Sequence, residues 1–227
     1  MNNPSAIVPG QSVGLIGLGL VGTALAKRLS SAGYQCIGFD VRHEAMLAFQ
    51  NVGFQTSASI EGMLKQTNVL VLAVFDTSGV MDVIAQIKQH WPIQKNAPQP
   101  VLTLIDCSTG DPVKLAELAP ALAADNIQFI EAPLSGSSVQ IENGQATLLL
   151  GGDVLDIQNA APVLNALATS QQHVGGAGMA AKAKLATNLV LGLNRAALAE
   201  GMVFAQTMGI APETFLQLVL NTPARSE

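Results

Sequence analysis

The stretch Gly14-Leu15-Ile16-Gly17-Leu18-Gly19-Leu20-Val21-Gly22 decides the fold. It continues the apolar run Ser12–Ile16 and leads into Leu20–Ser31, where apolar residues recur at helical spacing. Three glycines spaced G-x-G-x-x-G let a chain turn tightly from a strand into a helix and let its backbone approach a phosphate. The stretch therefore predicts a strand, a glycine-rich turn and a helix, in that order.

Asp40 supports a bound dinucleotide. It ends the next apolar run, Gln35–Phe39, where a carboxylate can accept hydrogen bonds from the adenine ribose hydroxyls. The glycines could be ordinary turn residues and Asp40 a solvated strand end, but strand, spacing and acid coincide here. Asp40 favours NAD because it would repel a 2′-phosphate, whereas Arg42 could bind that phosphate, so NADP stays an alternative.

The cofactor-binding residues expected from this reading surround the turn and the ends of the neighbouring strands. They are Gly17, Leu18, Gly19, Leu20, Val21, Gly22, Asp40, Arg42, Val74, Phe75 and Ser108.

Short apolar runs and helical stretches alternate as far as residue 175. Further strands are expected near residue 54 and at 69–74, 101–105, 127–132, 146–150 and 171–174, and further helices at 43–50, 59–66, 79–90, 112–124 and 153–168. Such alternation predicts an α/β fold with a Rossmann-like, doubly wound, mostly parallel sheet. Asp111 and Pro112 are a typical cap and first residue of a helix.

Beyond this sheet the composition changes. Residues 177–208 contain no proline and consist mostly of Ala, Leu, Lys, Met and Val, which predicts one long helix ended by Gly209. Pro212 begins another helix shortly before the sequence ends. We therefore expect a dinucleotide-binding domain over residues 1–175, and over 176–227 a long linking helix with the incomplete beginning of an all-α domain.

Composition argues against several classes of protein. The chain has 11 basic and 16 acidic residues, a net charge of -5 and no run of Lys or Arg, which disfavours nucleic acid and anionic lipid as partners. Cys36 and Cys107 lie in apolar runs, which is typical of buried thiols in a reducing compartment. Two cysteines are also too few ligands for a metal site. No signal peptide or membrane span is visible, so we expect a cytoplasmic protein without a metal.

Two loops after strands carry small polar residues, where ligands of doubly wound sheets collect. Residues 106–112 place two hydroxyls at a helix N-terminus, and residues 133–138 offer serines and Gly136 to an anion. The hydroxyls could instead cap the helix, and the second loop could be a plain turn. The expected substrate-binding residues in these loops are Ser108, Thr109, Ser135, Gly136 and Ser137.

Lys184 is the candidate for proton transfer. It lies four residues before Asn188, about 40° around a helix and therefore on the same face, whereas Lys182 lies about 240° from Asn188 and points elsewhere. Lys184 is flanked by alanine and leucine, and partial desolvation would lower its pKa toward neutrality. The alternative is an ordinary surface lysine.

The chain resembles the β-hydroxyacid dehydrogenases, the family of 3-hydroxyisobutyrate dehydrogenase and tartronate semialdehyde reductase, which is related to 6-phosphogluconate dehydrogenase. Three motifs carry the resemblance in order, at residues 14–22, 106–112 and 132–136, and the likeness spans nearly the whole chain. It implies that Ser108, Ser135 and Gly136 hold a substrate carboxylate, that Lys184 is the general acid and base, and that Asn188 orients the substrate.

The implied reaction is reversible hydride transfer between a nicotinamide cofactor and a small β-hydroxyacid or its semialdehyde or keto form. The chain departs from the family at Val21, where Met is common, at Ser137, where a second Gly is usual, and at Thr187, which replaces the first of two asparagines. The family spacing from glycine to lysine would select Lys182, but the asparagine spacing and the helical face select Lys184.

Two other readings remain open. Imine reductases share the fold and the glycine fingerprint but generally lack this lysine. A non-catalytic module would bind NAD or support oligomerisation without turnover. Because family members continue into a helical domain that closes the cleft and builds a homo-oligomer, the resemblance implies an oligomer when that domain is complete and leaves the activity of a truncated chain open.

Overall fold

The computed structural model of the chain describes residues 9–91 and 100–225. The chain divides into two compact units, one ending at Lys184 and one beginning at Leu185. Within the described residues, no helix combines the length and apolar character needed to span a membrane.

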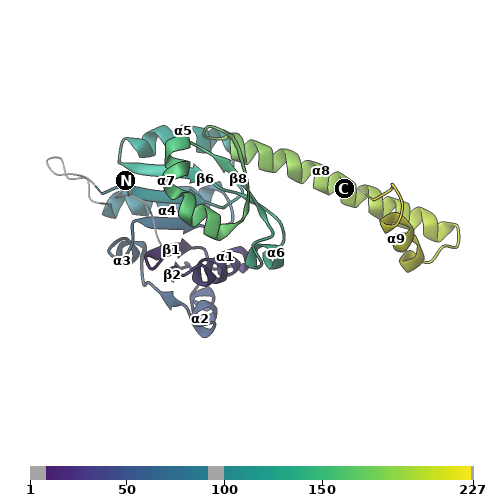
Figure 1. Cartoon of the computed structure of the whole chain (residues 1–227), viewed down its shortest axis with the longest axis horizontal. Helices are drawn as coiled ribbons and strands as arrows, with labels where there is room; N and C mark the ends of the chain where they lie inside the picture. The colour runs from purple at the N-terminus through teal and green to yellow at the C-terminus, as the bar shows by residue number, and fades with distance from the viewer. Residues whose placement is uncertain (1–8, 92–99, 226–227) are drawn as a thin grey trace. The chain divides into compact units, whose positions relative to one another are not determined.

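The first unit is built on one sheet (Figure 1). Its described strands run in the order β3-β2-β1-β4-β5-β6-β8-β7, with β9 also paired to β8. Pairing is parallel from β3 to β6 and between β8 and β9, and antiparallel where β8 meets β6 and β7. The bounds are β1 (Ser12–Ile16), β2 (Gln35–Phe39), β3 (Gln55–Thr56), β4 (Val69–Leu72), β5 (Leu102–Asp106), β6 (Ile127–Glu131), β7 (Leu134–Ser135), β8 (Thr147–Gly151) and β9 (Ser170–Gly175).

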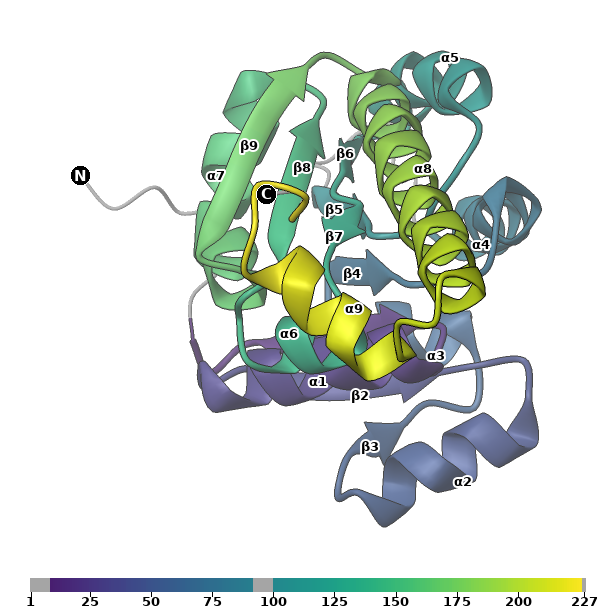
Figure 2. The ribbon, with the colours of Figure 1, turned by 90° about the vertical axis from the view of Figure 1, so that its right-hand side faces the viewer.

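Helices pack on both faces of this sheet. Alternate residues of a strand point to opposite faces, so Val69 and Val71 join a core with α1 and α7, while Leu70 and Leu72 join a core with α3, α4 and α5. Short α2 lies with β3 at the β2 edge (Figure 2). The helices are α1 (Leu20–Ser31), α2 (His43–Asn51), α3 (Ile60–Leu64), α4 (Thr77–His90), α5 (Pro112–Ala123), α6 (Ser138–Glu142) and α7 (Val154–Leu167).

The prediction of a doubly wound, mostly parallel sheet is confirmed, and the expected elements differ from the observed ones by a few residues. The predicted cap is also present, because the Asp111 carboxylate accepts a hydrogen bond from the Val113 N–H at 2.9 Å. The segment after Ala132 differs from the expected plain loop. It forms strand β7, paired to β8, and then helix α6.

Helix α8 (Met179–Thr207) begins in the first unit and continues into the second, where a turn leads to α9 (Pro212–Leu220). The predicted long helix and the stop at Gly209, which has a φ of 81°, are confirmed. Within the second unit Gly201 faces Phe215, and a Cβ at Gly201 would lie 3.1 Å from the Phe215 ring. Most large apolar side chains of this unit are exposed. The domain boundary expected at residues 175 and 176 stays a prediction.

Candidate cofactor and substrate site

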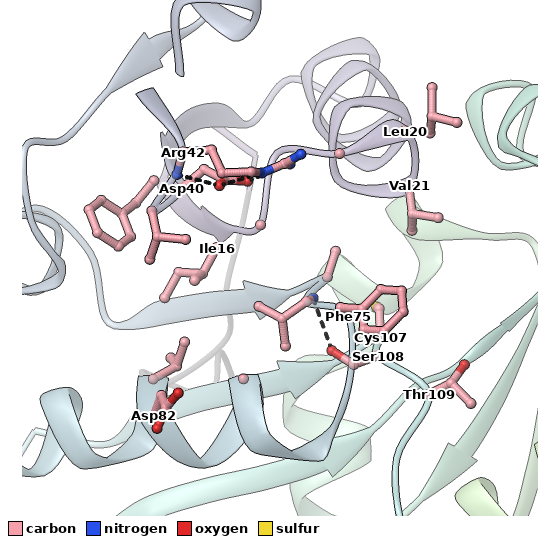
Figure 3. Close-up of a pocket in the computed structure, with 18 of the residues that line it drawn as sticks. Ile16, Leu20, Val21, Asp40, Arg42, Phe75, Asp82, Cys107, Ser108 and Thr109 are labelled. Atoms are coloured by element: carbon pink, nitrogen blue, oxygen red, sulfur yellow. Dashed lines mark hydrogen bonds and ion pairs between the residues drawn. The ribbon is translucent and has the colours of Figure 1, made fainter. Parts of the chain in front are cut away.

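A pocket of about 700 Å³ opens beyond the carboxyl ends of β1, β2, β4 and β5 (Figure 3). The chain moves from β1 to β2 on one side and to β4 on the other, so this is the point where the strand order reverses. Ligands of doubly wound sheets bind at such switch points. Of the residues predicted to bind the cofactor, the pocket is lined by Gly17, Gly19, Leu20, Val21, Asp40, Arg42, Val74, Phe75 and Ser108.

The three glycines of the fingerprint have different surroundings. Gly17 has a φ of 93°, and a Cβ there would collide with the Ala73 carbonyl. A Cβ at Gly22 would collide with the Gly17 carbonyl, so Gly22 lets α1 pack against the turn without lining the pocket. Gly19 has no atom within 4 Å of an added Cβ and faces the pocket. Gly17 and Gly22 therefore serve close packing, and Gly19 leaves open space.

Helix α1 begins at the pocket without a capping side chain or an acidic residue in its first turn. By contrast, side chains cap α3, α4, α5, α6 and α7. Helices α2 and α9 also begin without a capping side chain. The missing cap of α1 is informative because α1 starts at the pocket. The N–H groups of its first turn, which no described side chain caps, and the positive end of its dipole can hold an anion such as a pyrophosphate.

Asp40 presents an ionised carboxylate, with the residue only 7% exposed. It accepts hydrogen bonds from the Leu18 N–H and the Arg42 N–H, each at 2.8 Å, and its carboxylate pairs with the Arg42 guanidinium at 3.2 Å. Burial alone would raise the pKa of Asp40, but the hydrogen bonds from Arg42 and Leu18 outweigh it and hold that pKa below its usual range. Leu18 is buried and acts on the site through its N–H.

The loop after β5 joins the pocket through Ser108 and Thr109. The Val74 N–H donates a hydrogen bond to Ser108 Oγ at 3.1 Å (Figure 3), and the Ser108 N–H donates to Asp106 Oδ1 at 2.9 Å. Ser108 is buried, whereas Thr109 is exposed. Since Asp111 caps α5, neither hydroxyl serves as that cap. Ser108 thus ties the loop after β4 to the loop after β5.

Two buried carboxylates behind this loop were not predicted. Asp106 and Glu131 are partners in the register of β5 and β6, and each is 1% exposed. Burial raises the pKa of Asp106 to about 6; hydrogen bonds from Ser108 oppose this rise and the nearby Glu131 adds to it. Burial also raises the pKa of Glu131. Their pairing depends on the register of two strands, which the sequence pattern does not specify.

The second predicted loop lies outside the lining of this pocket. Ser135, Gly136 and Ser137 are all exposed. Ser137 caps α6 in a capping box, in which its N–H donates to Gln140 Oε1 at 2.8 Å and its Oγ accepts from the Gln140 N–H at 3.3 Å. The Ser-x-x-Gln pattern is the sequence signal that could have identified this box.

The two lysines of α8 differ in burial. Lys184 is partly buried and burial lowers its pKa, whereas Lys182 is exposed. Lys184 does not line the pocket, and Asn188 is an exposed residue of the second unit. The pocket therefore brings together the predicted cofactor residues, with Ser108 and Thr109 as the members of the predicted substrate set that line it.

The cysteines of the chain are Cys36, in β2, and Cys107, which lines the pocket. Cys36 and Cys107 are buried free thiols, and burial raises the pKa of Cys36 to about 12. Burial raises the pKa of Cys107 as well. No group of three or more His, Cys, Asp or Glu side chains among residues 9–91 and 100–225 could hold a metal ion.

Residues 12–197 match the family model described as the NAD binding domain of 6-phosphogluconate dehydrogenase. The chain belongs to this family. Residues 176–227 match a second model, described as NAD-binding of NADP-dependent 3-hydroxyisobutyrate dehydrogenase. The resemblance stated from three sequence motifs is thereby confirmed, and the family is one of nicotinamide-dependent oxidoreductases.

Individual relatives agree with this assignment. The chain is 29% identical to an uncharacterized oxidoreductase of Synechocystis, with 92% of this chain and 70% of that protein covered. It is 26% identical to 2-(hydroxymethyl)glutarate dehydrogenase of Eubacterium barkeri, with 94% and 70% covered. The crystal structure of 3-hydroxyisobutyrate dehydrogenase from Salmonella typhimurium superposes with a TM-score of 0.83 at 26% identity, over 95% of this chain and 74% of that one.

An imine reductase from Pseudomonas sp. shares the fold. Its structure superposes with a TM-score of 0.78 at 22% identity, over 93% of this chain and 71% of that one. The fold is therefore common to enzymes of two kinds of chemistry, and the residues of the site must distinguish them.

Proposed function

We propose that this chain binds NAD across the pocket and oxidises a small β-hydroxyacid, or reduces the corresponding semialdehyde or keto acid. One observation carries the proposal: the uncapped start of α1 and the ionised Asp40 line one pocket at the strand-order switch. The α1 N–H groups suit a pyrophosphate, Asp40 suits ribose hydroxyls, and the space beside Gly19 admits the cofactor. The bound nicotinamide would accept or supply the hydride.

NAD rather than NADP is the proposed cofactor. The Asp40 carboxylate would repel a 2′-phosphate, and the Arg42 guanidinium that could attract it is already paired with Asp40. NADP stays the alternative, because one matching family model is described as NADP-dependent and Arg42 is exposed enough to turn toward a phosphate.

For the substrate, we propose that its carboxylate is held by Ser108 and Thr109 and by the exposed Ser135-Gly136 segment, with Asn188 orienting it. Ser137 contributes less to this proposal than the sequence suggested, because its N–H and hydroxyl serve the α6 capping box. Short hydroxyacids fit a site whose polar residues are small hydroxyls and backbone N–H groups.

The proposed acid and base is Lys184. In oxidation, neutral Lys184 Nζ accepts the hydroxyl proton as the C–H bond of the same carbon breaks and its hydride leaves. In reduction, the ammonium form donates that proton to the carbonyl oxygen as hydride reaches the carbon. Burial lowers the pKa of Lys184, which raises the fraction of the neutral base near physiological pH.

The test is a panel of small β-hydroxyacids offered with NAD and with NADP. Lys184→Met should lower kcat by about 100-fold or more, the usual range for a lost acid-base group, and should leave NADH binding intact. Lys182→Met tests the lysine that the family spacing would select, and it should keep turnover because Lys182 is exposed on the same helix. Turnover that survives Lys184→Met would rule out the assignment of the base.

The second candidate is imine reduction, which the shared fold favours. It predicts turnover of cyclic imines, no turnover of hydroxyacids and little effect of Lys184→Met. NADH binding without turnover of either class would instead support a non-catalytic module.

Two broader expectations from the sequence also stay proposals. The buried free thiols Cys36 and Cys107 fit the reducing cytoplasm. A homo-oligomer would cover the exposed apolar residues of the second unit. Localisation by microscopy and light scattering of the purified protein would test these proposals.

A further inference from the structure

The carboxylate of Glu131 holds the first turn of α8. Glu131 is the last residue of β6 and is buried. Its Oε1 accepts a hydrogen bond from the Gly178 N–H, and its Oε2 accepts one from the Ala181 N–H at 2.9 Å. Lys184 follows Ala181 by three residues on the same helix. A single side chain therefore connects the end of the sheet to the helix that carries the proposed base.

The Glu131 carboxylate accepts the two backbone N–H groups that two separate side chains accept in a capping box. In a capping box, one side chain bonds the N–H of the third helical residue and another bonds the N–H of the cap residue. Here Gly178, which precedes the helix, offers no side chain, and Glu131 accepts both N–H groups from 47 and 50 residues away. The charge also lies at the positive end of the α8 dipole, which favours it.

Close packing fixes the same turn on two further sides. Gly178 has a φ of 83°, and a Cβ there would lie 2.6 Å from the Pro112 carbonyl oxygen at the start of α5. A Cβ at Gly151, the last residue of β8, would lie 3.0 Å from the Ala180 Cβ. The start of α8 thus lies against α5 and β8 as well as against Glu131.

Two of the residues that contact this turn, Glu131 and Pro112, lie next to or within the proposed substrate segments. Glu131 directly precedes residues 132–136, and Pro112 ends residues 106–112. Moving the start of α8 would therefore change the position of Lys184 relative to both segments. All of these residues belong to the first unit.

We propose that Glu131 is a positioning residue, whose carboxylate fixes the first turn of α8 and thereby the place of Lys184 relative to the two substrate segments. The inference rests on the proposed function, since the position of Lys184 matters for turnover only if Lys184 is the acid and base. A plain structural cap is the competing explanation, and it predicts a loss of stability without a change at Lys184.

The test measures Lys184 directly, without turnover. Competitive acetylation followed by mass spectrometry, across a range of pH, gives the pKa of Lys184, with Lys65 and Lys114 as internal references. In Glu131→Gln one acceptor oxygen becomes an NH2 group that cannot accept from an N–H. The loosened turn should admit water to Lys184, so we expect its pKa to rise toward the ordinary value. Loss of a negative charge alone would lower that pKa, so the direction separates the two causes.

Kinetics add a second readout. If the chain turns over hydroxyacids, Glu131→Gln should lower kcat by about 10- to 100-fold, the usual cost of a small misplacement, and should change the Kd of NADH by less than about twofold. Glu131→Asp keeps both oxygens on a shorter stem. Glu131→Asp should fold even if Glu131→Gln does not. It should change the pKa of Lys184 and kcat in the same direction as Glu131→Gln, but by less.

Asp153→Ala is the matched control, because it removes a helix cap elsewhere in the first unit. Asp153 caps α7 in a similar way, with its Oδ1 accepting from the Leu155 N–H at 2.8 Å and from the Asp156 N–H at 3.3 Å. This variant should lose stability and leave the pKa of Lys184 and kcat unchanged. An unchanged or lowered Lys184 pKa in both Glu131 variants would overturn the inference. A wild-type chain without turnover would contradict the proposed function alone, and the acetylation profile would still decide the role of Glu131.

Discussion

Asp106 is a carboxylate that the folded chain holds away from water. Its Oδ1 accepts the Ser108 N–H, while its Oδ2 is buried and has no hydrogen-bond partner among the described residues. Glu131 lies beside it in the next strand. Burial, as the largest cause, raises the pKa of Asp106 to about 6. The protonated form is therefore favoured by the fold, and the ionised form is tolerated at a cost.

This cost predicts a pH-dependent effect of Asp106→Asn. A carboxyl group with a raised folded-state pKa contributes stability that is fully present below its unfolded pKa of 3.8 and is lost as the pH rises through about 6. Asparagine keeps one acceptor for the Ser108 N–H and has no charge to bury. The free energy of unfolding of the variant minus that of the wild type should therefore increase between pH 4 and pH 7, by at most about 3 kcal/mol.

Urea denaturation of both proteins at several pH values in this range measures the difference. A constant difference between the two free energies of unfolding would show that the pKa of Asp106 is the same in the folded and unfolded states.

Lys184 predicts a reciprocal pH dependence of the two directions of turnover. Its lowered pKa means that oxidation, which needs the neutral amine, should speed up as the pH rises through that pKa. Reduction needs the ammonium form and should slow down over the same window, which lies below the ordinary value of 10.5. Profiles of kcat in both directions provide the measurement, and two rates that change in the same direction with pH would argue against a single group.

At the scale of elements, local signals predicted most of the fold. The glycine fingerprint, the pair Asp111 and Pro112, and the proline-free composition of α8 each act through neighbours in sequence, so strand, turn, cap and helix could be read directly. Strand β7 has two residues and therefore shows no periodicity. The Glu131 contacts join residues 47 and 50 positions apart, so they depend on tertiary packing that periodicity does not encode.

The turn before α1 predicts opposite outcomes for two glycines of one motif. Gly19→Ala should change the free energy of unfolding by no more than about 0.5 kcal/mol, because the added Cβ meets no atom within 4 Å, but it should weaken NADH binding by filling the space beside the phosphates. Gly22→Ala should destabilise the protein by more than about 1 kcal/mol, because its Cβ collides with the Gly17 carbonyl.

Thermal denaturation and NADH titration of each variant separate these effects. Gly176→Ala is the matched control, since its Cβ also enters open space but the residue does not line the cofactor pocket. If Gly19→Ala bound NADH as tightly as Gly176→Ala does, the pyrophosphate could not lie at the start of α1.

At the scale of the whole molecule, the cofactor pocket belongs to one of the two units. Its lining residues run from Ile16 to Thr109, and the first unit extends to Lys184. The chain spans 70% of the length of two curated relatives. All residues that line the pocket therefore belong to a single unit, whereas Asn188 belongs to the other.

This division predicts where NADH protects the backbone. Saturating NADH should slow hydrogen exchange at the glycine turn, at Asp40 and in the loops after β4 and β5, because those amides lie at the pocket. It should leave exchange in residues 210–225 unchanged. Hydrogen-exchange mass spectrometry of the full chain makes the comparison, and strong protection confined to α9 would place the cofactor elsewhere.

The most direct measurement is a pair of binding titrations, with NADH and with NADPH, on the wild type and on Asp40→Asn. The wild type should bind NADH at least about tenfold more tightly, because an ionised Asp40 repels a 2′-phosphate. Asp40→Asn should narrow or reverse that ratio while Arg42, released from its ion pair, turns toward the phosphate. A wild type that prefers NADPH, or a ratio that Asp40→Asn leaves unchanged, would contradict the placement of the adenine ribose at Asp40.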